Sequence, residues 1–150
     1  MVSISALIIA RNEEKKIENT LKSIAFVDEI IIVLDRTTDN TEKICKKFTK
    51  KIYKGKWISE GRRRNFGIDK CNSTWILEID ADEVVSNDLS KEIKQVIRDN
   101  AYDFFYLSLV NYIGLTPVKF GWMACLAPDG KFSLFKKKNK SWLDGRVNPD

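Results

Sequence analysis

Two aspartates separated by one residue follow an apolar stretch in the middle of the chain. Residues 75–79 are apolar apart from Glu78, and Asp80, Ala81 and Asp82 come directly after them. In an extended backbone, Asp80 and Asp82 leave on the same side, where their charges repel unless a cation lies between them. Mg²⁺ prefers such oxygen ligands and commonly binds one or two carboxylates together with substrate phosphates. The pair therefore predicts a divalent-metal site beside a phosphate, with an acidic surface turn as the simpler alternative.

A run of arginines lies shortly before this pair. Ser59 is a good helix N-cap, and it would place Arg62, Arg63 and Arg64 in the first turns of a helix. Arginines at that end oppose the helix dipole, so a nearby anion would explain them. The alternative is a solvated basic face. The formal net charge of +5, from 26 Lys and Arg against 21 Asp and Glu, likewise favours an anionic partner such as a nucleotide.

The composition is typical of one globular domain. Of the 150 residues, 43% are hydrophobic and 31% are charged, which is enough to build a single core. The three cysteines, Cys45, Cys71 and Cys125, are scattered, which favours free thiols in a reducing cytoplasm over disulfides or a zinc site. There is no histidine, so acid–base chemistry would fall to Asp or Glu. No apolar run reaches the roughly 18 residues of a membrane span.

The elements that position these residues alternate between strands and helices. Strands are predicted at residues 2–10, 29–34, 51–53 and 74–79, each followed by a helix. Asn12 is predicted to cap the first helix, and Asp39 the second, in a capping box with Glu42. This order predicts an α/β fold with a right-handed, mostly parallel sheet covered by helices on both faces.

Three of the predicted strands end in polar clusters, at residues 11–13, 35–39 and 80–82. Parallel strands bring their carboxyl ends to one edge of the sheet, which is where ligands bind in such folds. The convergence of the three clusters favours the metal-and-diphosphate interpretation over the acidic turn.

The last third of the chain has a different pattern. Residues 103–111 and 131–136 are predicted strands, and the long connection between them is typical of a functional loop. Four lysines at residues 136–140 lie beside Phe135 and Trp142. They are either a solvated tail or a patch that contacts anionic lipid, where each basic residue contributes about 1 kcal/mol.

The sequence resembles the family-two nucleotide-sugar glycosyltransferases of the GT-A fold. It looks most similar to the branch that builds lipopolysaccharide core, typified by the heptose β-1,4-glucosyltransferases. The resemblance covers nearly the whole chain, and it is carried by residues 8–14, 28–33 with Asp35 and Asp39, 64–66, 80–83, 121–122 and 134–137. Several motifs in the family's order are far more specific than one Asp-x-Asp.

The resemblance implies an inverting hexosyl transfer from a nucleotide diphosphate sugar, with a UDP-sugar as the first choice. The acceptor would be a cell-envelope glycan or glycolipid such as lipopolysaccharide core, and no nucleic acid is expected as a partner. Mg²⁺ or Mn²⁺ would be the cofactor. Residues 1–100 would form the nucleotide-sugar-binding part of a single domain, and residues 101–150 the start of its acceptor-side part. The protein would act in the cytoplasm, with contact to the inner face of the membrane as a further expectation.

The resemblance also implies roles for particular residues. The nucleotide would be bound by Ala10, Arg11, Asn12, Glu13, Asp35, Asp39, Arg64, Asn65 and Asp80. Of these, the turn at residues 10–13 and Asp35 would hold the base and ribose, while Arg64 and Asn65 would lie toward the diphosphate. Asp82 would ligate the metal, and Asp80 would reach the ribose or the metal. The metal would neutralise the charge that builds on the departing diphosphate.

A carboxylate must also deprotonate the acceptor hydroxyl. Asp129 is nominated because the branch has an Asp before its Leu-Phe pair, with Glu83 and Asp150 as the other candidates. The chain departs from the branch at Ser133, where a basic residue is usual, and at Asn148, where a histidine is usual. Related proteins also continue well beyond residue 150, so the acceptor-side part is expected to be reduced or truncated.

Two other functions compete with a transferase. A module without an acceptor half would bind the nucleotide sugar without transferring it. A nucleotidyltransferase also sets carboxylates and a metal against phosphates, but it is expected to have a Gly-rich phosphate loop near its N-terminus. Residues 10–13 contain no glycine, which disfavours the nucleotidyltransferase.

Overall fold

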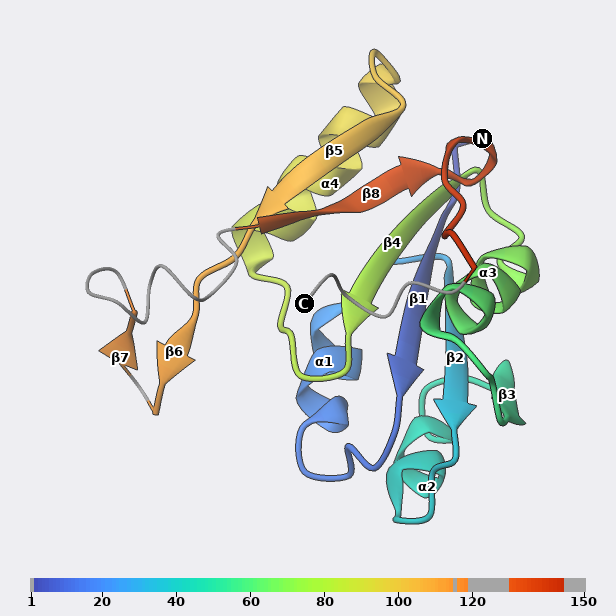
Figure 1. The fold of residues 1–150 in the computed structure, drawn as a ribbon. Helices are drawn as coiled ribbons and strands as arrows, with labels where there is room; N and C mark the ends of the chain where they lie inside the picture. Colours follow the sequence, from blue (N-terminus) through green and yellow to red (C-terminus); the bar gives the residue numbers. More distant parts are fainter. Residues whose placement is uncertain (1, 115, 119–129, 145–150) are drawn as a thin grey trace.

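The computed structural model describes residues 2–114, 116–118 and 130–144 (Figure 1). Their centre is a six-stranded sheet with the strand order β3-β2-β1-β4-β8-β5. Its strands are β1 (Ile4–Ala10), β2 (Glu29–Asp35), β3 (Ile52–Gly55), β4 (Trp75–Asp80), β5 (Phe104–Ser108) and β8 (Gly130–Lys136). The strands β1 to β4 run parallel, and β8 is antiparallel to both β4 and β5. A two-stranded sheet, β6 (Tyr112–Ile113) and β7 (Thr116–Pro117), stands apart from it.

Helices cover both faces of the sheet. On one face, α1 (Ile17–Ser23), α2 (Thr41–Cys45) and α4 (Asn87–Asp99) contribute to a core that also contains every second residue of β1 and β4. On the opposite face, α3 (Glu60–Lys70) packs on the intervening strand residues, and a short 3₁₀ helix (Lys137–Asn139) follows β8 (Figure 1). The predicted mostly parallel α/β sheet with helices on both faces is therefore confirmed.

The predicted Ser59 cap is confirmed, and a serine also caps α4. The Ser59 hydroxyl accepts a hydrogen bond from the Arg62 backbone N–H at 3.3 Å, and Ser86 does the same for Leu89 at 3.1 Å. The Ser59 cap begins α3 at Glu60. It thereby sets which arginines face the sheet.

The prediction that Asn12 caps the first helix is wrong. Asn12 has a left-handed backbone, with φ of 55°, and its side-chain oxygen accepts the Thr38 N–H at 2.8 Å. The helix α1 begins at Ile17, after a turn in which the N–H groups of Lys16 and Ile17 bond to the Glu13 carbonyl. A contact with the loop after β2 has replaced the local cap.

The predicted capping box of Asp39 and Glu42 is also absent. The residue at the cap of α2 is Asn40, and it makes no side-chain cap. Asp39 accepts the backbone N–H of Thr41 at 3.0 Å and that of Glu14 at 3.1 Å. Glu42 pairs instead with lysines, among them Lys46 at 2.8 Å. Asp39 therefore joins the loop after β2 to the loop after β1.

A polar cluster closes the opposite edge of the sheet. Glu29, at the start of β2, is buried and accepts hydrogen bonds from Ser5, Lys51 and both nitrogens of Asn72. Burial disfavours the charged carboxylate, but these hydrogen bonds together outweigh it and lower the pKa of Glu29 to about 2.

This cluster predicts an acid-sensitive contribution to stability. The pKa of Glu29 is lower in the folded chain than its unfolded value of about 4.3, so its contribution is complete above that value and is lost as pH falls toward 2. Between pH 6 and pH 3, we expect the wild type to lose about 2 kcal/mol more of its free energy of unfolding than Glu29→Gln. Urea unfolding at several pH values measures this difference, with the exposed Glu92→Gln as the control. Parallel pH profiles for wild type and Glu29→Gln would contradict the assignment.

Candidate active site

The polar loops after β1, β2 and β4 meet at one edge of the sheet, as predicted. The parallel register places Ala10 beside Leu34 and Ile9 beside Asp80. The loops after β1 and β2 are cross-linked, since the Glu13 N–H also donates to Thr41 at 2.8 Å. Burial would raise the pKa of Asp39, but its hydrogen bonds, among them those from Thr41 and Glu14, outweigh that effect and lower it. These residues form a fixed frame at the carboxyl ends of the strands.

Asp35 lies at the carboxyl end of β2 and is buried, with 3% of its surface exposed. Its carboxylate pairs with Arg63 of α3 at 2.8 Å and accepts the Trp57 N–H at 3.4 Å. Arg36, which follows it, is held in the left-handed region with φ of 51°. Such conformations in a residue other than glycine concentrate at binding sites. The site therefore presents a buried carboxylate flanked by a guanidinium.

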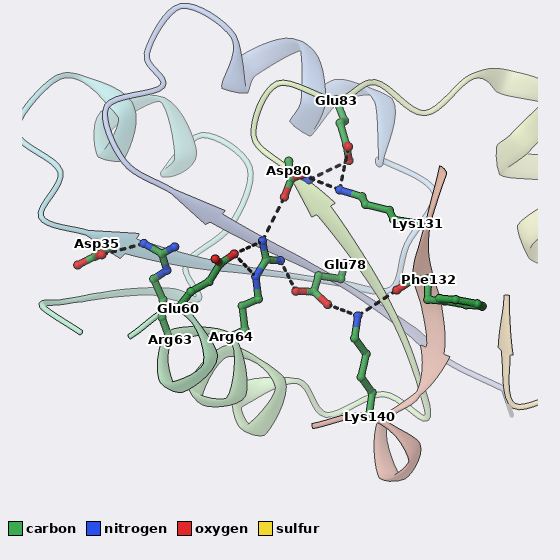
Figure 2. Close-up of polar contacts among 10 residues, drawn as sticks. All are labelled: Asp35, Glu60, Arg63, Arg64, Glu78, Asp80, Glu83, Lys131, Phe132 and Lys140. Atoms are coloured by element: carbon green, nitrogen blue, oxygen red, sulfur yellow. Dashed lines mark hydrogen bonds and ion pairs between the residues drawn. The ribbon is translucent and has the colours of Figure 1, made fainter. Parts of the chain in front are cut away.

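Arg63 is a site residue that the sequence interpretation did not single out. The signal was present in the Ser59 cap, which fixes the rotation of α3. With that start, Arg62 forms an exposed pair with Asp144. Arg63 and Arg64 instead turn toward the sheet (Figure 2). The Nε of Arg63 is buried and has no hydrogen-bond partner among the described residues.

Arg64 lies at the centre of a partly buried ionic network on the α3 face of the sheet (Figure 2). Its guanidinium contacts Glu78 of β4, Glu60 at 2.7 Å and Asp80 at 3.7 Å. Glu78 is buried and also binds Lys140 at 2.8 Å. The network extends from the middle of β4 to its carboxyl end, so Arg64 connects the core to Asp80.

The expectation that Asp80 and Asp82 both lie in an extended strand was wrong. The strand β4 ends at Asp80, and the next residues turn, with the Glu83 N–H donating to the Asp80 carbonyl at 3.1 Å. The Glu83 carboxylate accepts the Asp80 N–H at 3.0 Å and closes the turn. Asp80 then pairs with Lys131 at 2.7 Å and Asp82 with Lys16 at 3.2 Å.

These two carboxylates suit a metal that is shared with a substrate. Their side chains are 47% and 50% exposed at the sheet edge, and each already attracts a cation. No group of three or more potential ligands is placed to hold a metal within the described part of the chain. Mg²⁺ and Mn²⁺ would then take their remaining oxygen ligands from phosphates and water, as Mg²⁺ does in many nucleotide sites. The donor set of Asp80 and Asp82 fits such an ion.

The remaining predicted nucleotide ligands differ in their surroundings. Arg11 is exposed at the sheet edge. The Asn65 amide is engaged elsewhere, because it donates to the Trp142 carbonyl at 2.9 Å and accepts the Trp142 N–H at 2.8 Å. The Arg64 guanidinium lies 4.6 Å from the centre of the Trp142 ring. Asn65 thus fastens the segment after β8 to α3, and its role at a diphosphate stays a prediction.

The nominated base Asp129 lies outside the described residues, as do Asp150 and Asn148. Glu83 is described. One of its oxygens accepts the Asp80 N–H, and the other pairs with Lys131 at 2.8 Å. Glu83 therefore positions the turn, while the choice of base stays a prediction.

The basic run that begins at the last residue of β8 is largely committed to internal contacts. Lys136 pairs with Asp103 at 2.7 Å, Lys137 donates to the Cys71 carbonyl at 2.6 Å, and Lys140 binds Glu78. These three ammonium groups do not form an open patch for lipid, so the predicted membrane contact has no support from them. Among the residues in the described ranges, no helix has the length and apolarity needed to cross a membrane.

Together, the sheet order and the helices on both of its faces define an α/β domain of the GT-A fold. Residues 5–141 match the model of glycosyl transferase family 2. The chain therefore belongs to that family.

Relatives in sequence agree with this assignment. An uncharacterized glycosyltransferase of Rickettsia typhi is 34% identical over 104 residues, which cover 69% of this chain and 36% of that protein. The lipopolysaccharide core biosynthesis glycosyltransferase LpsC of Rhizobium meliloti is 25% identical, over 63% of this chain and 37% of its own length. The chain thus spans about a third of the length of these relatives.

Solved structures agree on the fold. TarS of S. aureus (residues 1–349, in complex with UDP) superposes with a TM-score of 0.63 at 17% identity, covering 91% of this chain and 47% of that one. Glucosyl-3-phosphoglycerate synthase of Mycobacterium tuberculosis, in complex with Mg²⁺ and UDP, gives a TM-score of 0.50 at 23% identity, over 55% of this chain and 34% of its own. At these identities, the likeness establishes the fold alone.

Proposed function

We propose that this domain binds a UDP-sugar together with Mg²⁺ or Mn²⁺ and takes part in an inverting transfer of the sugar to a cell-envelope glycan or glycolipid. The observation that carries the proposal is the pair of Asp35 and Arg63 at the same sheet edge as the turn of Asp80 and Asp82. The uridine nucleotides in the TarS complexes support the choice of UDP. The relative LpsC supports an acceptor in lipopolysaccharide core.

The two halves of the site have complementary chemistry. A uracil ring presents an imide N–H beside carbonyl oxygens, so it can donate to the Asp35 carboxylate and accept from the Arg63 guanidinium. Asp80 and Asp82 would hold the metal, which would supply positive charge to the departing diphosphate. Arg64 lies 3.7 Å from Asp80 and keeps it in place from the α3 side.

Thermal unfolding tests the donor site. We expect UDP with MnCl₂ to raise the Tm by several degrees, because ligand at a hundred times its Kd stabilises the folded state by about 2.7 kcal/mol. Asp82→Ala should remove the metal-dependent part of the increase, whereas Asp88→Ala, which changes an exposed carboxylate of α4, should keep it. An unchanged Tm across UDP, GDP and CDP would refute the donor site.

Turnover separates a transferase from a module that only binds. We expect slow, Mn²⁺-dependent hydrolysis of the matching UDP-sugar without acceptor, and faster release of UDP when lipopolysaccharide core acceptors are added. Release is followed by a coupled UDP assay over a panel of sugars. UDP-sugar binding with neither hydrolysis nor transfer would favour the binding module.

A further inference from the structure

Lys131 is a residue of the site that no motif identified. It is the second residue of β8, whose antiparallel pairing with β4 brings it to the carboxyl end of that strand (Figure 2). Its ammonium lies 2.7 Å from Oδ2 of Asp80 and 2.8 Å from Oε1 of Glu83. The Lys131 side chain is 30% exposed, so it lies at the rim of the site and not within the core.

Both oxygens of Asp80 face protein cations. Oδ1 faces Arg64 at 3.7 Å, and Oδ2 faces Lys131. A divalent cation that binds Asp80 therefore meets the Lys131 ammonium at the same carboxylate. Two cations so close repel strongly where water is partly excluded.

We propose that Lys131 competes with the divalent cation for Asp80. The ammonium holds the turn of Asp80 and Glu83 together in the metal-free protein, and it leaves Asp80 when the metal binds. Lys131 is thus a positioning residue that sets the metal affinity of the site. This inference rests on the proposed metal-dependent function.

The contacts make such an exchange feasible. Lys131 has a long, flexible side chain, and Glu83 remains as its partner after Asp80 is given up. Ion pairs that are partly open to solvent contribute little to stability, so their loss opposes metal binding only modestly. Lys16 pairs with the second carboxylate, Asp82, at 3.2 Å. This ion pair is longer than that of Lys131 with Asp80, and the Lys16 side chain is 61% exposed.

The first arm of the test measures Mn²⁺ binding directly by electron paramagnetic resonance. We expect Lys131→Met to lower the Kd for Mn²⁺ about threefold to tenfold, from the modest strength of such pairs. Lys131→Arg should stay close to wild type. Lys91→Met, which removes a surface charge on α4, should also stay close to wild type. Lys16→Met should have a smaller effect than Lys131→Met. Equal or weaker binding by Lys131→Met would overturn the proposal.

The second arm uses the wild-type chain, so it does not depend on the folding of a variant. Amine acylation followed by mass spectrometry reports how accessible each ammonium is. We expect saturating MnCl₂ to speed acylation of Lys131 several-fold and to leave Lys136, which pairs with Asp103, unchanged. Mn²⁺ binding without a change at Lys131 overturns this inference alone. If the wild type binds no Mn²⁺ with or without UDP, the metal-dependent function fails as well.

Discussion

Arg64→Met is expected to lower the free energy of unfolding by about 3 kcal/mol, because it leaves a buried carboxylate without its main partner. The Glu78 side chain is 5% exposed in the middle of β4, and Arg64 is 16% exposed above it. Lys140 remains on Glu78, but it approaches from the segment after β8 and does not reach Glu60 or Asp80. The same change removes the guanidinium from the Trp142 ring. Urea unfolding followed by circular dichroism measures the loss.

The matched control is the neighbouring arginine. Arg62 belongs to the same helix, but its pair with Asp144 is exposed, at 57% and 54% of the two side chains. Pairs of that kind contribute about 0–1 kcal/mol, so Arg62→Met should have little effect. Adding Glu78→Leu to Arg64→Met should recover part of the stability, since the buried Glu78 carboxylate is then no longer present without its main partner. A cost for Arg64→Met no larger than that for Arg62→Met would show that the network is not a structural support.

The parts of the fold that depend only on residues close together in the sequence were predictable. The apolar, β-branched runs identify β1, β2 and β4, and the Ser59 cap before α3 forms as expected. Asn12 did not behave as a cap because its partner lies in another loop, and Asp39 accepts both the nearby Thr41 N–H and the Glu14 N–H of another loop. Thr38 is 26 positions away from Asn12, and Glu14 is 25 positions away from Asp39. At Asn12 the tertiary hydrogen bond takes the place of the local cap.

The sequence predicted where the candidate site lies in the fold, but only some of the contacts between its residues. Polar residues after parallel strands meet at one edge whatever their detailed conformation, so the position of Asp35 and Asp80 at this edge was predictable. The contact of Lys131 with Asp80 required the antiparallel pairing of β8 with β4, between residues about fifty positions apart. The turn at Asp82 likewise depends on the Glu83 side chain, which closes it. Sequence spacing alone could not distinguish that turn from a continuing strand.

Asp35→Asn is expected to raise the Kd for UDP about tenfold to a hundredfold, which corresponds to the loss of one charge-assisted hydrogen bond. The amide keeps the size of the side chain but presents an N–H where the carboxylate accepts. It also leaves Arg63 without its ion-pair partner at 2.8 Å, so the guanidinium is no longer held in position to bind the uracil ring. Isothermal titration with UDP measures the change.

The control for this variant is a carboxylate at the opposite end of β2. Asp28 precedes β2 and accepts the Ile4 N–H at 2.9 Å, so Asp28→Asn alters a carboxylate near β2 without touching the carboxyl edge. It should bind UDP like the wild type. The Mn²⁺ affinity of Asp35→Asn should be similar to that of the wild type, because Asp80 and Asp82 are unchanged. This comparison separates recognition of the uracil ring from binding of the metal. If Asp35→Asn binds UDP with wild-type affinity while folded, the base is not held by Asp35 and Arg63, and the nucleotide must occupy another part of the edge.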